Sequence, residues 1–77
     1  MGKTALYTWL MGKTLMSRLR EYRTAKALTQ EQLAASVGVS RQTIVAVEKG
    51  NYVPSVALAM ELSKCLDCPV ETLFYWS

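Results

Sequence analysis

Apolar residues recur at helical spacing along most of this chain. Leu19 and Tyr22 lie three residues apart, and Leu58, Leu62 and Leu66 recur every four residues, a spacing typical of one helix face. Helix-capping residues and glycines divide this pattern into short segments, and no segment carries a clear strand signal. The pattern predicts an all-α fold with five helices, at about residues 16–26, 30–37, 41–49, 56–66 and 70–75.

The second and third of these helices are separated by a very short connection. Thr29, followed three residues later by Gln32, forms a capping box that starts one helix. Gly38 can take the left-handed conformation that ends it, and Ser40 offers the next N-cap. Two helices joined this closely cannot lie side by side and must cross steeply. This is the geometry of a helix-turn-helix, at about residues 29–49.

Residue sizes within this segment agree with that geometry. Ala34 is small where the crossing helix would press close, and Val37, Ile44 and Val47 can fill the angle from inside. With Ile44 and Val47 turned inward, positions 41, 42, 45, 46 and 49 must point outward.

The charge distribution favours a polyanionic partner for the first half of the chain. The chain has 77 residues, enough for one domain, with 51% hydrophobic residues, 19% charged residues and a net charge of +3. Every lysine and arginine except Lys64 lies within residues 1–50, whereas the acidic residues are divided evenly between the two parts. A solvated basic face without a partner remains the alternative on charge alone.

The outward start of the third helix carries side chains that can read DNA. Arginine pairs well with guanine and glutamine with adenine in the major groove, which the start of a recognition helix enters. The alternative is an ordinary polar helix start. The predicted base contacts are Arg41, Gln42, Thr43 and Ala46; the predicted phosphate contacts are Thr29, Gln30, Ser40, Lys49 and Arg18.

Two short motifs suggest other chemistry but lack necessary parts. Gly12-Lys13-Thr14 resembles the end of a phosphate-binding loop, yet Tyr7 stands where that loop requires a glycine. Cys65 and Cys68 have the spacing of a zinc knuckle, but the chain has no histidine and no other cysteine. Small core residues are the simpler interpretation, with thiolates shared across a dimer as the alternative. We expect no enzyme activity, cofactor or metal.

The first fifteen residues fall outside the helical pattern. We expect them to be an extension, with the domain spanning residues 16–77. A misassigned start or cloning remnant, a flexible arm, and a short helix that docks on a partner all remain open. No apolar run is long enough to span a membrane, so we expect a cytoplasmic protein.

Residues 17–76 resemble the Cro/repressor-type helix-turn-helix proteins, also called the xenobiotic-response-element family, and especially their short stand-alone members. The matches are Leu28-Thr29-Gln30-Glu31-Gln32-Leu33-Ala34, Gly38-Val39-Ser40-Arg41-Gln42-Thr43-Ile44, and Glu48-Lys49-Gly50-Asn51-Tyr52 with Pro54-Ser55. The resemblance implies a five-helix lambda-repressor-like bundle that binds operator DNA as a two-fold dimer.

The resemblance also implies roles for individual residues. The groove-entering residues correspond to Arg41, Gln42 and Ala46, and the glutamine that anchors a phosphate corresponds to Gln30. An ion pair that braces the recognition helix would join Arg23 to Glu48. Ala27 stands where the family usually has glycine, which suggests strain or a different helix end.

Together these features predict a sequence-specific transcriptional regulator, a repressor that binds a palindromic operator in double-stranded DNA as a homodimer. We expect the apolar C-terminal residues Phe74, Tyr75 and Trp76 to form the dimer interface. The alternative function is a protein-interaction module, such as an antitoxin or anti-regulator, that uses the same fold and binds a protein partner through its termini.

Overall fold

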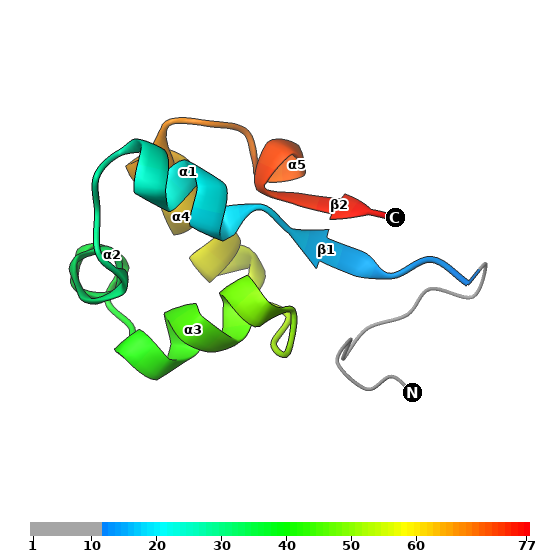
Figure 1. The fold of residues 1–77 in the computed structure, drawn as a ribbon, viewed down its shortest axis with the longest axis horizontal. Coiled ribbons are helices and arrows are strands. Elements are labelled where there is room, and N and C mark those ends of the chain that lie inside the picture. Colours follow the sequence, from blue (N-terminus) through cyan, green and yellow to red (C-terminus); the bar gives the residue numbers. More distant parts are fainter. Residues whose placement is uncertain (1–11) are drawn as a thin grey trace.

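The computed structural model describes residues 12–77, and Figure 1 shows their arrangement. Within this part of the chain, five helices are flanked by two short strands. The elements in chain order are β1 (Leu15–Ser17), α1 (Leu19–Ala25), α2 (Gln30–Val37), α3 (Arg41–Lys49), α4 (Val56–Leu66), α5 (Val70–Leu73) and β2 (Phe74–Trp76).

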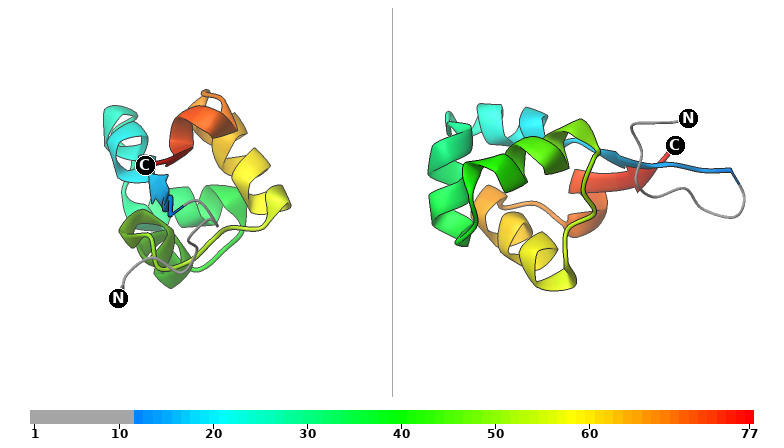
Figure 2. Two further views of the ribbon diagram at one scale, coloured as in Figure 1. Left: turned by 90° about the vertical axis from the view of Figure 1, so that its right-hand side faces the viewer. Right: turned by 90° about the horizontal axis from the view of Figure 1, so that it is seen from below.

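The helices enclose one apolar core. Every helix contributes to it, and its side chains are almost completely removed from solvent, so their burial is the main favourable term in folding. Figure 2 shows the helices grouped together, with the strands extending from the group on the side opposite α2. The buried apolar residues are Leu19, Leu33, Ala34, Ile44, Val47, Leu58, Leu62, Leu66 and Leu73.

The capping signals read from the sequence determine the helix boundaries. The side chain of Thr29 accepts from the Gln32 amide while the Gln32 side chain accepts from the Thr29 amide, so the capping box is confirmed. Ser40 caps α3, and Gly38 ends α2 in the left-handed region with φ 77°. The helix predicted at 56–66 is likewise confirmed, because Ser55 caps α4.

A small antiparallel sheet departs from the all-helical pattern predicted from the sequence. β1 pairs with β2 so that Leu15 lies opposite Trp76 and Ser17 opposite Phe74. The helices predicted at 16–26 and 70–75 are therefore too long, because α1 begins at Leu19 and α5 ends at Leu73. Short apolar runs are ambiguous between helix and strand, and pairing between distant segments decided this case.

The sheet also changes the expected boundary of the domain. Leu15, which we placed in the extension, pairs within the sheet, and the backbone amide of Ser77 donates to the Thr14 carbonyl at 3.0 Å. Residues 1–11 lie outside the described residues. The three alternatives given for the extension, a misassigned start or cloning remnant, a flexible arm and a docking helix, therefore stay predictions.

α1 ends in a conformation that suits glycine better than the residue present. The Leu28 amide donates to the Arg23 carbonyl and the Ala27 amide to the Thr24 carbonyl, the two bonds of a Schellman motif. That motif requires its penultimate residue to be left-handed, and Ala27 has φ 58°. Alanine therefore replaces the family glycine at position 27 at the cost of backbone strain.

Replacing Ala27 with glycine is expected to stabilise the protein by about 0.5–1 kcal/mol. Relief of the left-handed strain exceeds the extra chain entropy that glycine gives the unfolded state. Urea unfolding followed by circular dichroism measures the difference. Ala35→Gly is the matched control, because Ala35 is exposed within α2, where glycine should destabilise by about 0.5–1 kcal/mol. Equal destabilisation by both changes would contradict this account.

Candidate nucleic-acid interface

α3 is held against the body of the protein by one face and exposes the other. In Figure 1 the view runs along α2 while α3 lies across it, so the two helices cross steeply. Ile44 is 0% and Val47 1% exposed, whereas Arg41 and Gln42 on the first turn are exposed. Val45 and Ala46 are half-buried beside this exposed tip.

The start of α3 is organised by two hydroxyl groups. The Thr43 backbone amide donates to Ser40 Oγ at 3.2 Å, and the Ser40 and Thr43 hydroxyls lie 3.0 Å apart. Both side chains predicted to contact DNA therefore also shape the helix start. Their bonds bracket Arg41 and Gln42 and hold the first turn of α3 that carries these two residues.

A buried ion pair connects α1 to the end of α3. Arg23 Nε donates to Glu48 Oε2 at 2.6 Å, and the two side chains are only 10% and 6% exposed. The other arms of the guanidinium donate to Glu48 Oε1 at 3.3 Å and to the Leu28 carbonyl at 2.8 Å. The pair implied by the family resemblance is thus present, and it fastens the end of α3 to α1.

Gln30 belongs to the same network. Its Nε2 donates to Glu48 Oε1 at 3.0 Å, so one carboxylate holds both α1 and the first residue of α2. The Gln30 side chain is thereby oriented, and its second amide N–H and its oxygen remain available for other partners. Thr29, the neighbouring phosphate candidate, is exposed and uses its side chain in the capping box.

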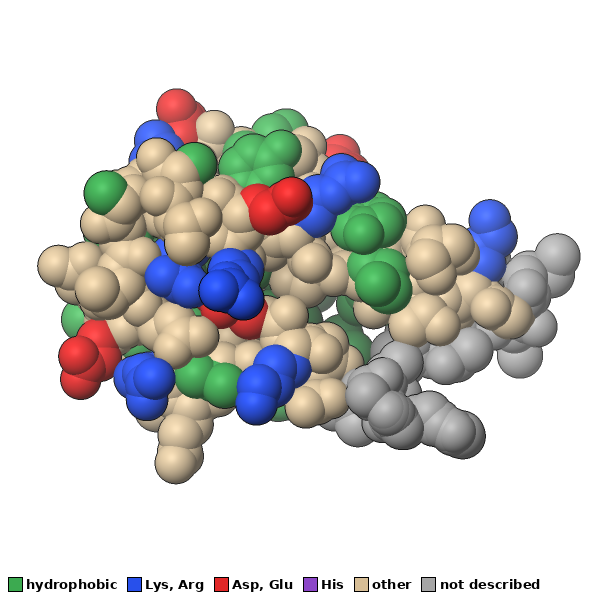
Figure 3. All heavy atoms as spheres, viewed as in Figure 1, with side chains coloured by type: hydrophobic (Ala, Val, Ile, Leu, Met, Phe, Trp, Pro, Cys, Tyr) green, Lys and Arg blue, Asp and Glu red, His purple; other side chains and the backbone are tan. Residues whose placement is uncertain are grey.

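These residues surround a polar hollow between α1, α2 and α3. Figure 3 shows lysine and arginine side chains gathered on this face, over α3 and between α3 and α1. The hollow contains three cationic side chains and one carboxylate. Its lining residues are Arg20, Arg23, Gln30, Val45, Glu48 and Lys49.

Two residues of this lining, Arg20 and Val45, were not predicted as site residues from the sequence. Helical spacing could have indicated both, because Arg20 lies three residues before Arg23 and Val45 four residues after Arg41. Arg18, which was a phosphate candidate, lies with its guanidinium carbon 4.1 Å from the centre of the Tyr75 ring. This cation–π contact ties Arg18 to β2.

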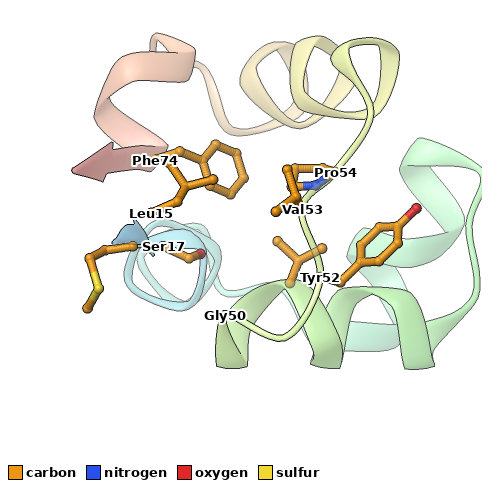
Figure 4. A pocket seen from close by; sticks show the side chains of 9 residues that line it. Leu15, Ser17, Gly50, Tyr52, Val53, Pro54 and Phe74 are labelled. Atoms are coloured by element: carbon orange, nitrogen blue, oxygen red, sulfur yellow. The ribbon is translucent and has the colours of Figure 1, made fainter. Parts of the chain in front are cut away.

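The predicted C-terminal aromatic residues have three different environments. Phe74 faces a small hollow, across from Val53 and Pro54 of the segment between α3 and α4 (Figure 4). Tyr75 is half-buried beneath Arg18. Trp76 is 42% exposed, so it is the most solvent-accessible of these three residues.

Comparison with known proteins identifies this arrangement. Residues 19–73 match the helix-turn-helix family, a span that contains all five helices of the described chain. The chain belongs to this family. Its crossed pair α2 and α3 is the helix-turn-helix motif, and α3 is the recognition helix.

Relatives of this helix-turn-helix protein carry regulatory names. An uncharacterized HTH-type transcriptional regulator of Methanocaldococcus jannaschii is 45% identical over 62 residues, which cover 80% of this chain and 94% of the relative. The cryptic phage CTXphi transcriptional repressor RstR of Vibrio cholerae is 33% identical over 57 residues, covering 74% of this chain and 51% of the repressor.

A solved structure supports the same assignment. The restriction-modification controller protein C.AhdI of Aeromonas hydrophila aligns with a TM-score of 0.66 and 41% identity, covering 70% of this chain and 82% of that chain. The protein described here is a DNA-binding helix-turn-helix transcriptional regulator. Within residues 12–77, none of the helices has the length and apolar character needed to cross a membrane.

The two cysteines of this helix-turn-helix protein are free thiols, half-buried and packed against the core. Among the described residues, no cluster of three or more metal-ligating side chains accompanies them. Burial, followed by the neighbouring Asp67 carboxylate, raises the pKa of the Cys68 thiol above its ordinary value, while Lys26 opposes the shift. A raised pKa disfavours the thiolate that metal binding and disulfide exchange require.

Alkylation is expected to report this shift. In a Cys65→Ser variant, the rate of Cys68 alkylation by iodoacetamide should rise with pH to a midpoint above that of the same thiol in urea. The raised pKa leaves less thiolate at any given pH below the midpoint. Comparing midpoints separates ionisation from simple shielding, which lowers the rate without moving the midpoint. Coincident midpoints would contradict the shift.

Proposed function

We propose that this regulator acts as a homodimeric repressor and that α3 reads the major groove of a palindromic operator. One observation carries the proposal. The capped start of α3 presents Arg41 and Gln42 to solvent while Ile44 and Val47 anchor the helix in the core. We place the protein in the cytoplasm with its DNA and assign it no catalytic role.

Base recognition is assigned to four residues of α3. Arg41 supplies a bidentate donor suited to guanine, and Gln42 supplies the donor and acceptor suited to adenine. Ala46 offers a small apolar surface suited to a thymine methyl group. Thr43 contributes through its methyl group or its backbone, because its hydroxyl is paired with Ser40.

Phosphate contacts are assigned around the crossed helices. The N-terminus of α2 brings free backbone N–H groups and Gln30 to one strand of the duplex. Thr29, Ser40 and Lys49 are exposed on the same motif. Arg18 is a further candidate phosphate contact. A DNA phosphate would have to compete with the Tyr75 ring for its guanidinium group.

Dimerisation through the C-terminal strand is supported by its exposed apolar surface. Trp76 lies on β2, where the 42% exposed indole can pack against a second copy. A two-fold dimer also matches a palindromic operator, because each recognition helix then reads one half-site. The repressor assignment is supported by the name of the Vibrio cholerae relative.

Selection from random double-stranded DNA tests the proposal. We expect the bound pool to converge on an inverted repeat whose half-site centres are separated by about 34–36 Å, one turn of the duplex. Sedimentation should show a dimer at micromolar concentration, weakened by Trp76→Ser. Recovery of unrelated sequences would contradict base reading, and a single unrepeated site bound by a monomer would contradict the dimer.

A second candidate function rests on α4. Val56 is 76% and Met60 59% exposed, one helical turn apart, so this helix can bind another protein, as an antitoxin or anti-regulator would. DNA binding at two salt concentrations separates the candidates. A complete lack of salt-sensitive DNA binding would favour the protein-interaction function.

A further inference from the structure

The polar hollow between α1, α2 and α3 contains more cationic side chains than its one carboxylate pairs with. Glu48 is the carboxylate of the hollow, and it is occupied by Arg23 and Gln30. Arg23 in turn directs its remaining arm to the Leu28 carbonyl. The hollow therefore contains a neutralised pair at its back and two further cations, Arg20 and Lys49, at its edge.

Arg20 and Lys49 are available to an external anion. Both are exposed, and neither forms an ion pair with an acidic residue of the described chain. They come from different helices, the first turn of α1 and the last residue of α3. Gln30, whose amide is oriented by Glu48, lies in the same hollow with one N–H to donate.

We infer that Arg20 and Lys49 clamp one backbone phosphodiester of DNA over this hollow, with Gln30 donating to the same phosphate. The inference rests on the proposed entry of α3 into the major groove and adds Arg20 to that interface. A guanidinium suits the paired oxygens of a phosphate, whereas Lys49 contributes a point charge. Val45, the uncharged apolar residue of the lining, would face the sugar and base edge beside that phosphate.

The clamp gives the Arg23–Glu48 pair a second consequence. By neutralising Glu48, Arg23 removes the repulsion that a carboxylate would exert on a phosphate at this place. Arg23 is thus a positioning residue, while Arg20 and Lys49 touch the ligand. A contact that spans α1 and α3 would also fix the angle at which the recognition helix enters the groove.

Salt dependence of DNA binding by the full chain tests the clamp. The double variant Arg20→Gln/Lys49→Gln should lower the magnitude of the slope of log affinity against log salt by about 0.9 for each bound protomer, the contribution of one phosphate. Each single variant should lower it by part of that amount, because one cation remains on the phosphate. Arg20→Lys should keep the slope. Two control variants remove one positive charge elsewhere. Lys64→Gln lies on α4, and Lys26→Gln lies at the other end of α1, beside Cys68. Both controls should leave the slope unchanged.

Neutral methylphosphonate linkages locate the contact on the DNA. Neutralising one position in each half-site of the selected operator should lower the affinity of the unmodified protein by about tenfold or more. The same neutralisation should cost the Arg20→Gln variant far less. If Arg20→Gln responds to every neutral linkage as the unmodified protein does, or if Lys26→Gln lowers the slope equally, the clamp is overturned.

These results distinguish the clamp from the proposed function. Binding of the operator with unchanged affinity and slope in Arg20→Gln refutes the clamp alone. An absence of specific binding by the unmodified protein refutes the proposed function. Inorganic phosphate offers a last control. If it binds the hollow at millimolar concentration and DNA does not displace it, the hollow is a site for free phosphate and the clamp is refuted.

Discussion

Alanine at both Arg41 and Gln42 is expected to lower affinity for the selected operator by about 10²- to 10⁴-fold. Each bidentate side-chain–base pair contributes roughly 1–3 kcal/mol of discrimination, and both side chains lie exposed at the tip of α3. Affinity for unrelated DNA should fall much less, because only one positive charge is lost. Fluorescence anisotropy titrations with operator and scrambled duplexes at one salt concentration measure both effects.

The same substitutions should spare the fold. Arg41 and Gln42 contribute no side chain to the core, and the cap at Ser40 and the contacts of Ile44 and Val47 remain. We expect the free energy of unfolding to change by no more than about 0.5 kcal/mol. Lys64→Ala, which also removes one positive charge, is the matched control for binding. A doubly substituted protein that still selects the original operator would assign base reading to other residues.

Breaking the Arg23–Glu48 pair from one side is expected to cost about 3–5 kcal/mol of stability. Either single alanine substitution leaves the opposite charge buried without its partner, since both side chains are 90% or more removed from solvent. Glu48→Ala also removes the acceptor of Gln30. A domain of this length is stable by only about 4–12 kcal/mol, so a large part of each single variant should unfold near physiological temperature.

A double substitution separates this cost from the net value of the pair. Arg23→Met with Glu48→Leu should recover most of the lost stability, because similar volumes are filled and no charge remains unpaired. The cycle consists of the unmodified protein, Arg23→Met, Glu48→Leu and the double variant, each unfolded with urea at 25 °C and followed by circular dichroism. If the single variants lose less than about 1 kcal/mol, the pair behaves like an exposed surface bridge. The double variant should still bind DNA less well, because Gln30 is no longer held in place.

The crossed helices α2 and α3 could be predicted from the sequence by itself. Thr29 with Gln32, Gly38 and Ser40 act within one helical turn of their own positions, so local chemistry determines where the helices begin and end. Ile44 and Val47 then leave one possible outward face, which includes Arg41 and Gln42. Membership of the helix-turn-helix family followed from the same stretch.

Only the tertiary structure decided the sheet and the composition of the hollow. Leu15 and Trp76 are too far apart in sequence for any local pattern to pair them, and the pairing converts two predicted helix ends into strands. Arg18 and Arg20 are two residues apart in the sequence, yet one lies over Tyr75 and the other lines the hollow. Residue type indicated a positive charge at both positions; the tertiary structure placed Arg18 beside Tyr75 of β2 and Arg20 beside α3, which determined the partner that each charge can reach.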